Sequence, residues 1–178
     1  MKVNPATSND YDIVANHQFA EIRKDRETGQ QVLFALKSFR KGEKISPLGA
    51  AFVSDKPSYL TVQTGNKTHI ALHPYFLQYI NHGCDPNCFF DTTKMEVTAL
   101  RDVAEGEEFT FFYPSTEWNM ASPFQCYCNQ PGCLGFINGA SHIPEEILKR
   151  YKLSDFIKRK VHYRLRKLKR AYPLFQLF

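Results

Sequence analysis

The sequence predicts a mainly β domain that is followed by a cysteine-rich segment and a basic helical tail. Short runs of β-forming residues alternate with turn residues up to residue 113. Three of the five cysteines then fall within residues 126–133. Residues 142–178 hold eleven bases and three acids, a net charge of +8, so the rest of the chain carries −3 of the overall +5. A length of 178 residues suits one compact domain with a short appendage.

The composition excludes two broad classes of protein. Hydrophobic residues make up 43% of the chain and aromatic residues 14%, which is enough apolar surface to offset the entropy lost on folding, so disorder throughout is excluded. No apolar run approaches the roughly 20 residues of a membrane-spanning helix, and the polar N-terminus lacks a secretory signal. We therefore expect an intracellular protein with no membrane partner. Five cysteines, an odd number, fit reduced thiolates around a metal better than a disulfide framework.

The first β elements are expected in two pairs. The first dozen residues are polar, show no periodicity and are expected to fray. Residues 32–39 and 45–53 are predicted to be two strands joined at a tight turn. Residues 59–63 and 69–72 flank Gly65 and are predicted to form a second hairpin.

The middle of the chain is expected to interrupt and then resume the β pattern. Pro74 is predicted to begin a short helix that runs to about Ile80, because proline is tolerated in the first turn. Residues 81–88 contain a glycine and a proline and are predicted to be a loop. Residues 95–103 and 108–113 are again predicted to be strands, separated by an acidic turn.

The tail is predicted to be helical from residue 143 onward. A proline followed by two glutamates suits a helix start, where acidic groups favour the positive end of the dipole. Four apolar residues at offsets of 0, 4, 8 and 11 share one face of an amphipathic helix: Ile157, Val161, Leu165 and Leu168. The basic residues take the other face, which is either a solvated surface or a surface for a partner.

The cysteines predict a zinc site. Cys126, Cys128 and Cys133 form a CxCx4C cluster in a segment too short to fold around its own core. Zinc would supply the missing stabilisation, and tetrahedral zinc takes four ligands. Cys84 or Cys88, from an earlier loop, is expected to complete the site. The alternative is that these cysteines are ordinary buried thiols.

Two further segments carry a resemblance to a known family. Residues 81–87 read NHGCDPN, which resembles the NHxCxPN signature of SET-domain protein lysine methyltransferases. Residues 105–113 read EGEEFTFFY, which is similar to the family's GEELTFDY segment. The CxCx4C cluster stands where the family has its post-SET zinc loop, and residues 41–45, KGEKI, resemble an early strand–turn–strand of that fold. The similarity covers about residues 20–136, in the family's order.

For the fold, the resemblance implies a β-clip of several small sheets, the SET-type fold, in which the two signature segments pass each other in a pseudoknot. It divides the chain into an N-terminal lead-in (1–19), a SET domain (20–114), a post-SET zinc-binding segment (115–140) and a basic helical extension (141–178). No family signature matches the extension, so its helical prediction rests on periodicity alone.

For the site, the resemblance implies S-adenosylmethionine as cofactor. Asn81 would lie near its methionine part, the backbone of His82 near its adenine, and Leu134 would pack on the adenine. Tyr113 would be the catalytic residue, and Phe111 would set the room around the target amine.

For the metal, the resemblance implies that Cys84 rather than Cys88 completes the site. The zinc ligands would then be Cys84, Cys126, Cys128 and Cys133. The zinc loop would form one wall of the cofactor pocket.

These residue types suit methyl transfer to an amine. A lysine side chain has an unperturbed pKa of about 10.4, so only about one part in a thousand is neutral and nucleophilic near neutral pH. A narrow aromatic channel disfavours the ammonium form by desolvation. The Tyr113 hydroxyl and backbone carbonyls would aim the amine at the sulfonium methyl, and positioning supplies most of the acceleration.

Each assignment has a simpler structural alternative. Asn81 and His82 could cap turns in a Gly/Pro loop. Tyr113 could be an ordinary strand aromatic, since strands favour tyrosine and the chain has nine. Phe111 could be no more than hydrophobic strand content.

Two positions depart from the family pattern. A glycine-flanked turn usually lets the backbone approach the cofactor, whereas this chain has Gln30, Gln31 and Val32 there. We expect this change to affect the strength or geometry of cofactor binding. The Asp that often precedes the catalytic tyrosine is Phe112 here, and we expect it to change a structural hydrogen bond rather than the chemistry.

The leading functional hypothesis is methyl transfer from S-adenosylmethionine to a lysine of a protein, with histone-like tails as candidate substrates because the mildly acidic body would attract a basic peptide. The alternative is a catalytically weak SET-like zinc module that binds nucleic acid or an acidic partner through its basic C-terminal helix. A third hypothesis is a zinc-dependent interaction domain without a cofactor pocket. The basic clusters of the tail predict nuclear residence if the source is eukaryotic.

Overall fold

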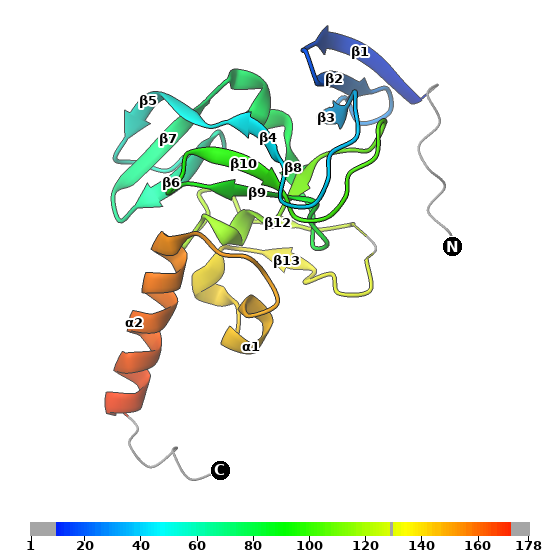
Figure 1. Cartoon of the computed structure of the whole chain (residues 1–178). Coiled ribbons are helices and arrows are strands. Elements are labelled where there is room, and N and C mark those ends of the chain that lie inside the picture. The colour runs from blue at the N-terminus through cyan, green and yellow to red at the C-terminus, as the bar shows by residue number, and fades with distance from the viewer. Residues whose placement is uncertain (1–9, 129, 172–178) are drawn as a thin grey trace.

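The structure, a computed structural model, describes residues 10–128 and 130–171. Its architecture is mainly β, as predicted: small sheets form the body, and the two α-helices lie at the C-terminal end (Figure 1). Residues 1–9, which belong to the lead-in that was expected to fray, lie outside the described residues. The rest of the lead-in contains a strand, β1 (Tyr11–Asn16), that was not predicted.

The N-terminal sheet explains why β1 was missed. β1 is an outer strand beside β2 (Ala20–Asp25), which pairs in turn with β3 (Gln31–Ala35), all antiparallel. β2 and β3 bury apolar side chains, whereas Ile13 on β1 is 62% exposed. Because β1 buries little, it lacks the alternating apolar pattern by which strands are recognised in a sequence.

A second three-stranded sheet has the order β5-β7-β6. Its strands are β5 (Gly49–Ser54), β6 (Thr61–Gly65) and β7 (Thr68–His73). β6 and β7 pair antiparallel around the turn after Gly65, which confirms the predicted hairpin.

The central sheet brings together the two signature segments. Its order is β4-β10-β9-β11-β8, formed by β4 (Lys44–Pro47), β8 (Asn81–His82), β9 (Cys88–Asp91), β10 (Glu96–Ala99) and β11 (Thr110–Phe111). β11 runs parallel to both β8 and β9, whereas the other pairs are antiparallel. Since β8 lies in the NHGCDPN segment and β11 in the EGEEFTFFY segment, these distant stretches of chain lie side by side.

The predicted pairing of residues 32–39 with 45–53 is wrong. β3 pairs with β2, and β4 pairs with β10. In place of the hairpin, Phe34 bridges to Glu108 and Phe39 to Val103. These contacts between distant parts of the chain depend on tertiary packing, which a local turn signal does not encode.

Short elements connect the sheets. The helix expected after Pro74 is present as the 3-10 helix η2 (Tyr75–Tyr79), and the loop predicted over 81–88 begins with β8. The remaining short elements are η3 (Tyr113–Ser115), β12 (Phe124–Gln125), β13 (Phe136–Ile137) and η4 (Ala140–His142). β12 and β13 pair antiparallel and frame the CxCx4C segment.

The tail forms two helices rather than the single helix predicted, α1 (Glu145–Leu148) and α2 (Asp155–Ala171). Ser154 caps the start of α2, because its Oγ accepts a hydrogen bond from the Ile157 N–H at 3.3 Å. Ile157 and Val161 are buried, but Leu168 is 51% exposed, so the predicted apolar stripe ends before it. Figure 1 shows α2 extending away from the sheets toward the C-terminus.

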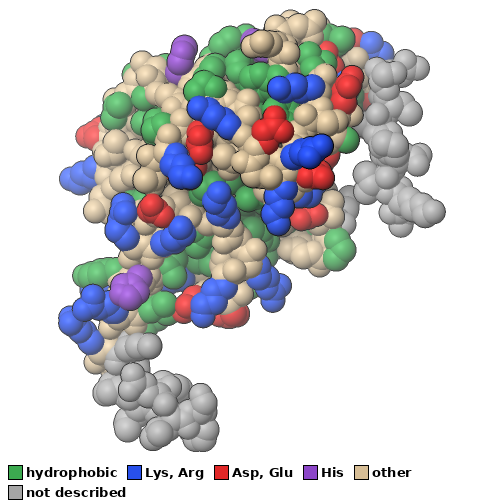
Figure 2. Space-filling model, viewed as in Figure 1, with side chains coloured by type: hydrophobic (Ala, Val, Ile, Leu, Met, Phe, Trp, Pro, Cys, Tyr) green, Lys and Arg blue, Asp and Glu red, His purple; other side chains and the backbone are tan. Residues whose placement is uncertain are grey.

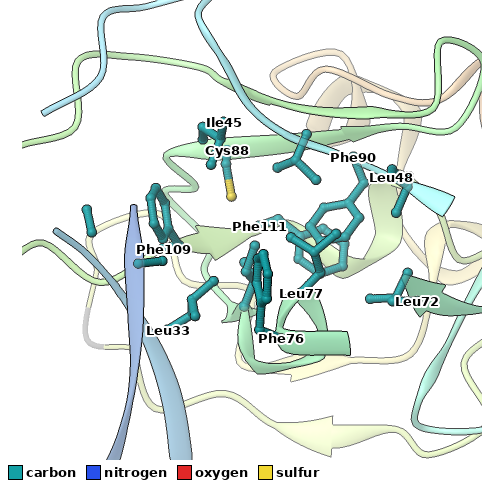
Figure 3. Packing of buried hydrophobic residues seen from close by; sticks show 14 of the residues in the cluster. Leu33, Ile45, Leu48, Leu72, Phe76, Leu77, Cys88, Phe90, Phe109 and Phe111 are labelled. Atoms are coloured by element: carbon teal, nitrogen blue, oxygen red, sulfur yellow. The ribbon is translucent and has the colours of Figure 1, made fainter. Parts of the chain in front are cut away.

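Two hydrophobic clusters hold these parts together. The larger one fills the space between the sheets, where Leu77, Phe90 and Phe111 pack near one another (Figure 3). A second cluster packs α1 and α2 against Phe112, next to the end of β11. No helix within residues 10–128 or 130–171 is both long and apolar enough to cross a membrane.

Candidate functional site

One cleft of about 750 Å³ collects most of the residues that the sequence singled out. Asn81, His82, Phe111 and Tyr113 all line it. The parallel pairing of β8 with β11 brings them together, and the Gly83 N–H continues it by donating to the Phe111 carbonyl at 3.1 Å. A side chain at position 83 would meet the Thr110 side chain at 2.8 Å, so glycine allows the two segments to approach this closely.

Asn81 lies where the N-terminal sheet meets the central sheet. Its Nδ2 donates a hydrogen bond to the Gln31 carbonyl at 3.2 Å. Gln31 is the first residue of β3 and stands in the stretch where the family pattern has a glycine-flanked turn, and the neighbouring Gln30 and Val32 line the cleft. The departure from the family pattern therefore lies at the cleft wall, in direct contact with a predicted cofactor residue.

His82 connects the cleft to the cysteine cluster. Its Nδ1 accepts a hydrogen bond from the Tyr113 N–H at 3.4 Å, and its Nε2 lies 3.3 Å from Cys84 Sγ. Burial lowers the pKa of His82 to about 4, so the ring is neutral near pH 7. A neutral ring can accept a hydrogen bond at one nitrogen while it donates a hydrogen bond from the other.

Tyr113 stands among aromatic rings at the end of β11. Phe111 lies 4.7 Å from it, His82 5.4 Å and Phe124 6.0 Å, measured between ring centroids. Its hydroxyl donates a long hydrogen bond to the Ile80 carbonyl at 3.5 Å. Burial and the nearby Glu108 carboxylate raise the pKa of Tyr113 to about 12. The phenol therefore stays protonated near neutral pH and can act as a hydrogen-bond donor.

Phe111 is buried and shared between the cleft and the core. Its ring lies 4.2 Å from that of Phe90 and 4.7 Å from that of Tyr113, between centroids. The aromatic wall beside the Tyr113 hydroxyl is therefore fixed by core packing.

Asn87 is a structural residue of the site that the sequence reasoning did not single out. It is only 1% exposed, and its Oδ1 accepts from the Thr110 N–H at 2.8 Å while its Nδ2 donates to the Glu108 carbonyl at 2.7 Å. These bonds fasten the NHGCDPN segment to the strand that leads to Tyr113. Its place as the last residue of the first signature was the signal that could have identified it.

The four predicted metal ligands converge on one point. The Sγ atoms of Cys84, Cys126, Cys128 and Cys133 all lie within 4.8 Å of one another. Cys84 and Cys126 are 3.9 Å apart, close to the separation of about 3.8 Å that zinc–sulfur bonds of about 2.3 Å give in a tetrahedron. Burial raises the pKa of the Cys84 thiol, so a cation is needed to hold a thiolate there. The donor set and its spacing fit zinc.

Two further predictions concern residues near the cysteine cluster: Cys88 was expected to stay outside the zinc site, and Leu134 was expected to pack on the adenine. Cys88 lies apart from the cluster, where its Sγ donates to the Thr110 carbonyl at 3.1 Å. Leu134 is half-buried and packs against both the cysteine cluster and the hydrophobic cluster of the tail. It is not among the described residues that line the cleft, so its predicted contact with adenine stays a prediction.

Two carboxylates in the cleft were also not singled out, Glu108 and Glu117. Burial raises the pKa of each to about 7. Glu108 lies within the second signature, so its position was visible in the sequence. Glu117 follows η3 in a stretch without a motif, and no sequence signal marked it.

The tail approaches the site through aromatic residues. The Tyr151 ring stacks on Phe112, with centroids 3.7 Å apart and planes at 8°, and its hydroxyl donates to the Cys84 carbonyl at 3.0 Å. Phe112 is the residue that replaces the family's Asp, so in this chain a ring stack occupies that position. On the other side, Lys160 and Arg164 of α2 lie over the Trp118 ring, at 5.1 and 5.4 Å from its centroid.

Comparison with known proteins gives the same fold from independent information. The family model described as SET domain matches residues 30–114. The protein named "Methyltransferase flvH" from Aspergillus flavus is 41% identical over 119 residues, which is 66% of this chain and 66% of that protein.

Histone methyltransferases are also among the relatives. Two proteins named as H3 lysine-36 specific histone-lysine N-methyltransferases are similar over smaller parts. That of Aspergillus oryzae is 40% identical over 35% of this chain and 7% of its own length. That of Saccharomyces cerevisiae is 30% identical over 50% of this chain and 14% of its own length. This chain therefore spans about two thirds of the first relative and a small part of the others.

A solved structure supports the fold alone. It is titled "crystal structure of KRYPTONITE in complex with mCHH DNA, H3(1-15) peptide and SAH", with a TM-score of 0.50 and 19% identity over 68% of this chain and 30% of that one.

Proposed function

Because the chain belongs to the SET-domain family, we propose that it transfers methyl groups from S-adenosylmethionine to a lysine side chain of a protein substrate. The observation that carries the proposal is the meeting of Asn81, His82 and Tyr113 in one cleft through the pairing of β8 with β11. A catalytically weak binding module would not need these three residues together. The proposal therefore favours an enzyme over the interaction-module alternatives.

The cleft offers a division of roles. S-adenosylmethionine supplies an electrophilic methyl group on a sulfonium when it is bound. We propose that Asn81 and the His82 backbone hold this ligand, and that Cys84, Cys126, Cys128 and Cys133 hold zinc, which fixes the adjoining cleft wall. The Gln31 carbonyl accepts a hydrogen bond from Asn81, so the missing glycine is expected to affect the strength or geometry of ligand binding.

Tyr113 is the proposed catalytic residue. Its hydroxyl keeps its proton at neutral pH and is held beside the Ile80 carbonyl, so the pair can orient a neutral amine. The rings of Phe111 and Tyr113 make its surroundings apolar, which disfavours the ammonium form of the target lysine. The contribution of these groups is positioning, which is worth much of the barrier in a two-reactant transfer.

A histone tail is the substrate that we propose first. The relatives named as H3 lysine-36 specific enzymes support this choice. The part of the chain before residue 142 has a net charge of −3, which favours a basic peptide. Action on histones would place the protein in the nucleus.

The test is a calorimetric titration of the zinc-loaded protein with S-adenosylmethionine, together with radiolabelled methyl transfer to mixed histones and to cell lysate. We expect saturable binding and a labelled protein band, both reduced about tenfold or more in Asn81→Ala. Asn66→Ala, in the exposed turn after β6, is the matched control and should change neither. Absence of binding by folded protein would overturn the proposal, and label only in the low-molecular-mass fraction would overturn its protein substrate.

We also propose a contact between α2 and nucleic acid. Arg159, Arg166 and Arg170 are exposed at offsets of 0, 7 and 11 along one face, and Asp155 is the single acid of the helix. The exposed Tyr163 ring lies between them along that face, with Lys167 above it at 5.1 Å from its centroid. Figure 2 shows Lys and Arg side chains over the whole visible face, including the lower end where α2 lies, and there they have few acidic neighbours. A positive face with an exposed ring suits phosphates and bases.

Binding of a labelled 20-base-pair duplex at several salt concentrations tests this contact. Replacing Arg159, Arg166 and Arg170 by Gln should weaken binding and lower the slope of log K against log salt by up to about 3. The matched control replaces three exposed lysines of the body by Gln: Lys41, Lys56 and Lys67. If both variants lost the same affinity for the duplex, net charge alone would explain the binding, and a specific role for α2 would be overturned.

A further inference from the structure

Glu117 is held firmly in the cleft wall, four residues after Tyr113. Its side chain is 8% exposed, and its Oε1 accepts from the Gln63 N–H at 2.7 Å and from Thr116 Oγ1 at 3.4 Å. Its backbone N–H donates to the Tyr113 carbonyl at 3.1 Å, and its carbonyl accepts from the Ala140 N–H at 2.8 Å. Both the backbone and one carboxylate oxygen are therefore fixed in place.

The second oxygen of this carboxylate is left for a ligand. Oε2 accepts no hydrogen bond from the described residues. It is not fully enclosed by protein, and Glu117 lines the cleft. No Lys, Arg or His nitrogen of the described residues forms an ion pair with it. Oε2 is therefore the free hydrogen-bonding position of a buried acidic group that opens into the cleft.

A purely structural role does not require a carboxylate here. The Gln63 N–H needs one acceptor oxygen, which a glutamine would provide without the cost of a buried charge. An unpaired carboxylate in such a place is unfavourable, and burial raises its pKa to about 7. A cation brought by a ligand would stabilise the charged form and would form a charge-assisted hydrogen bond.

The target amine itself is a poor candidate for this cation. A carboxylate beside the target lysine would favour the ammonium form, which cannot attack a methyl group. In addition, the Glu117 carboxylate is held by the Gln63 N–H, whereas the Tyr113 hydroxyl is held by the Ile80 carbonyl, so the two groups have separate partners. The carboxylate is therefore placed for a second positive group of the substrate.

We propose that Glu117 is a recognition subsite for a basic side chain that lies near the target lysine in the substrate sequence. This inference rests on the proposed function, because it takes the cleft to hold a lysine-containing peptide. Gln63 and Thr116 position the carboxylate, and its Oε2 contacts the substrate ammonium or guanidinium.

The test uses alanine-rich nonapeptides with a central lysine and one arginine moved through the eight other positions. Each is compared with a peptide that carries citrulline, an uncharged analogue of similar shape, at the same position. We expect the wild type to prefer arginine over citrulline at one position by about tenfold or more in kcat/KM, mainly through KM. Glu117→Gln keeps the acceptor for Gln63 and should reduce this preference to within about twofold. Glu105→Gln, an exposed acid elsewhere, should retain it.

A binding measurement separates failure of this inference from failure of the proposed function. Labelled peptides with norleucine in place of the central lysine are titrated by fluorescence anisotropy, which needs no methyl transfer. Loss of the arginine preference in Glu117→Gln supports the subsite even if no turnover is detected. An equal preference in wild type and Glu117→Gln, or no preference at any position, overturns it. Binding of S-adenosylmethionine should be unchanged in Glu117→Gln, which serves as the check on folding.

Discussion

The junction of β8 with β11 and the junction of the tail with the body are built in different ways. At the first, hydrogen bonds from Asn87 and Gly83 fix the backbone of one strand against another. At the second, the rings of Tyr151 and Phe112 stack, and the Tyr151 hydroxyl donates to the Cys84 carbonyl. One backbone bond, from the Ser154 N–H to the Ser115 carbonyl at 2.9 Å, also joins the described parts of tail and body. Backbone pairing sets positions closely, whereas ring packing tolerates substitution by other apolar groups. The first junction suits catalysis, and the second suits attachment of an added element.

The largest effect is expected from loss of the proposed metal. Cys84, one of its proposed ligands, follows β8 at the first junction, and its carbonyl accepts a hydrogen bond from the Tyr151 hydroxyl at the second. Cys128→Ser removes one of the four proposed zinc ligands, and metal binding at such a site is coupled to local folding. We expect zinc content to fall from about one equivalent towards zero, with loss of S-adenosylmethionine binding and loosening of the tail. Metal analysis and calorimetry measure this. Cys88→Ser is the control, since its Sγ lies outside the cluster; unchanged zinc in Cys128→Ser would show that the ligand set is wrong.

The next effect separates chemistry from structure at the first junction. Tyr113→Phe keeps the aromatic packing and removes the hydroxyl that faces the Ile80 carbonyl. We expect kcat to fall by roughly 10² to 10⁴, with zinc content and cofactor affinity unchanged. Tyr163→Phe, on the exposed face of α2, should have full activity. Equal turnover rates of Tyr113→Phe and wild type would remove Tyr113 from the mechanism.

A smaller effect is expected at the second junction. Tyr151→Ala removes the ring stack on Phe112 and should lower the free energy of unfolding by about 2 kcal/mol, since the ring is half-buried. Tyr151→Phe keeps the stack and removes the bond to Cys84, at a cost of about 1 kcal/mol. Urea unfolding compares both with Tyr163→Ala. If Tyr151→Phe were as destabilised as Tyr151→Ala, the hydroxyl rather than the ring would hold the tail.

An effect of similar size is expected in the pH dependence of stability, which should differ between the body and the tail. Burial raises the pKa of Glu117 to about 7, so between about pH 5 and 7 the folded state binds more protons than the unfolded state. Stability should therefore fall as pH rises through this range, by on the order of 2 kcal/mol for this group. Glu117→Gln should remove this contribution and make the slope shallower, leaving that of Glu108, whose pKa burial also raises to about 7, whereas Asp155→Asn on α2 should leave the slope unchanged. Identical slopes for Glu117→Gln and wild type would contradict the assignment.

The sequence predicted most of what the backbone motifs determine. It predicted the mainly β class, the second hairpin and the convergence of four cysteines, and it anticipated that Asn81, His82 and Tyr113 would lie together, as they do in the cleft wall. These residues lie in contiguous signatures whose spacing reflects a shared backbone path. The pairing of β3 could not be predicted in this way, because it depends on a partner chosen by tertiary packing.

Three of the features that were missed come from single residues outside the signatures. Glu117 acquires its character from burial beside Gln63, which is distant in sequence. Tyr151 lies between two short helical patterns that periodicity merged into one, and its contact with Phe112 exists only after the tail folds back. Leu168 continues the helical spacing of Ile157 and Val161, but the body ends before α2 does, so its exposure follows from the shape of the domain.

The position of Trp118 gives the molecule a built-in optical probe. It is the only tryptophan in the chain, it follows Glu117 directly, and Lys160 and Arg164 of α2 lie over its ring. The fluorescence of an indole changes when a covering cation is removed or its hydration alters. Its emission should therefore report in one signal, and without any label, when α2 detaches from the body and when the wall of the cleft rearranges.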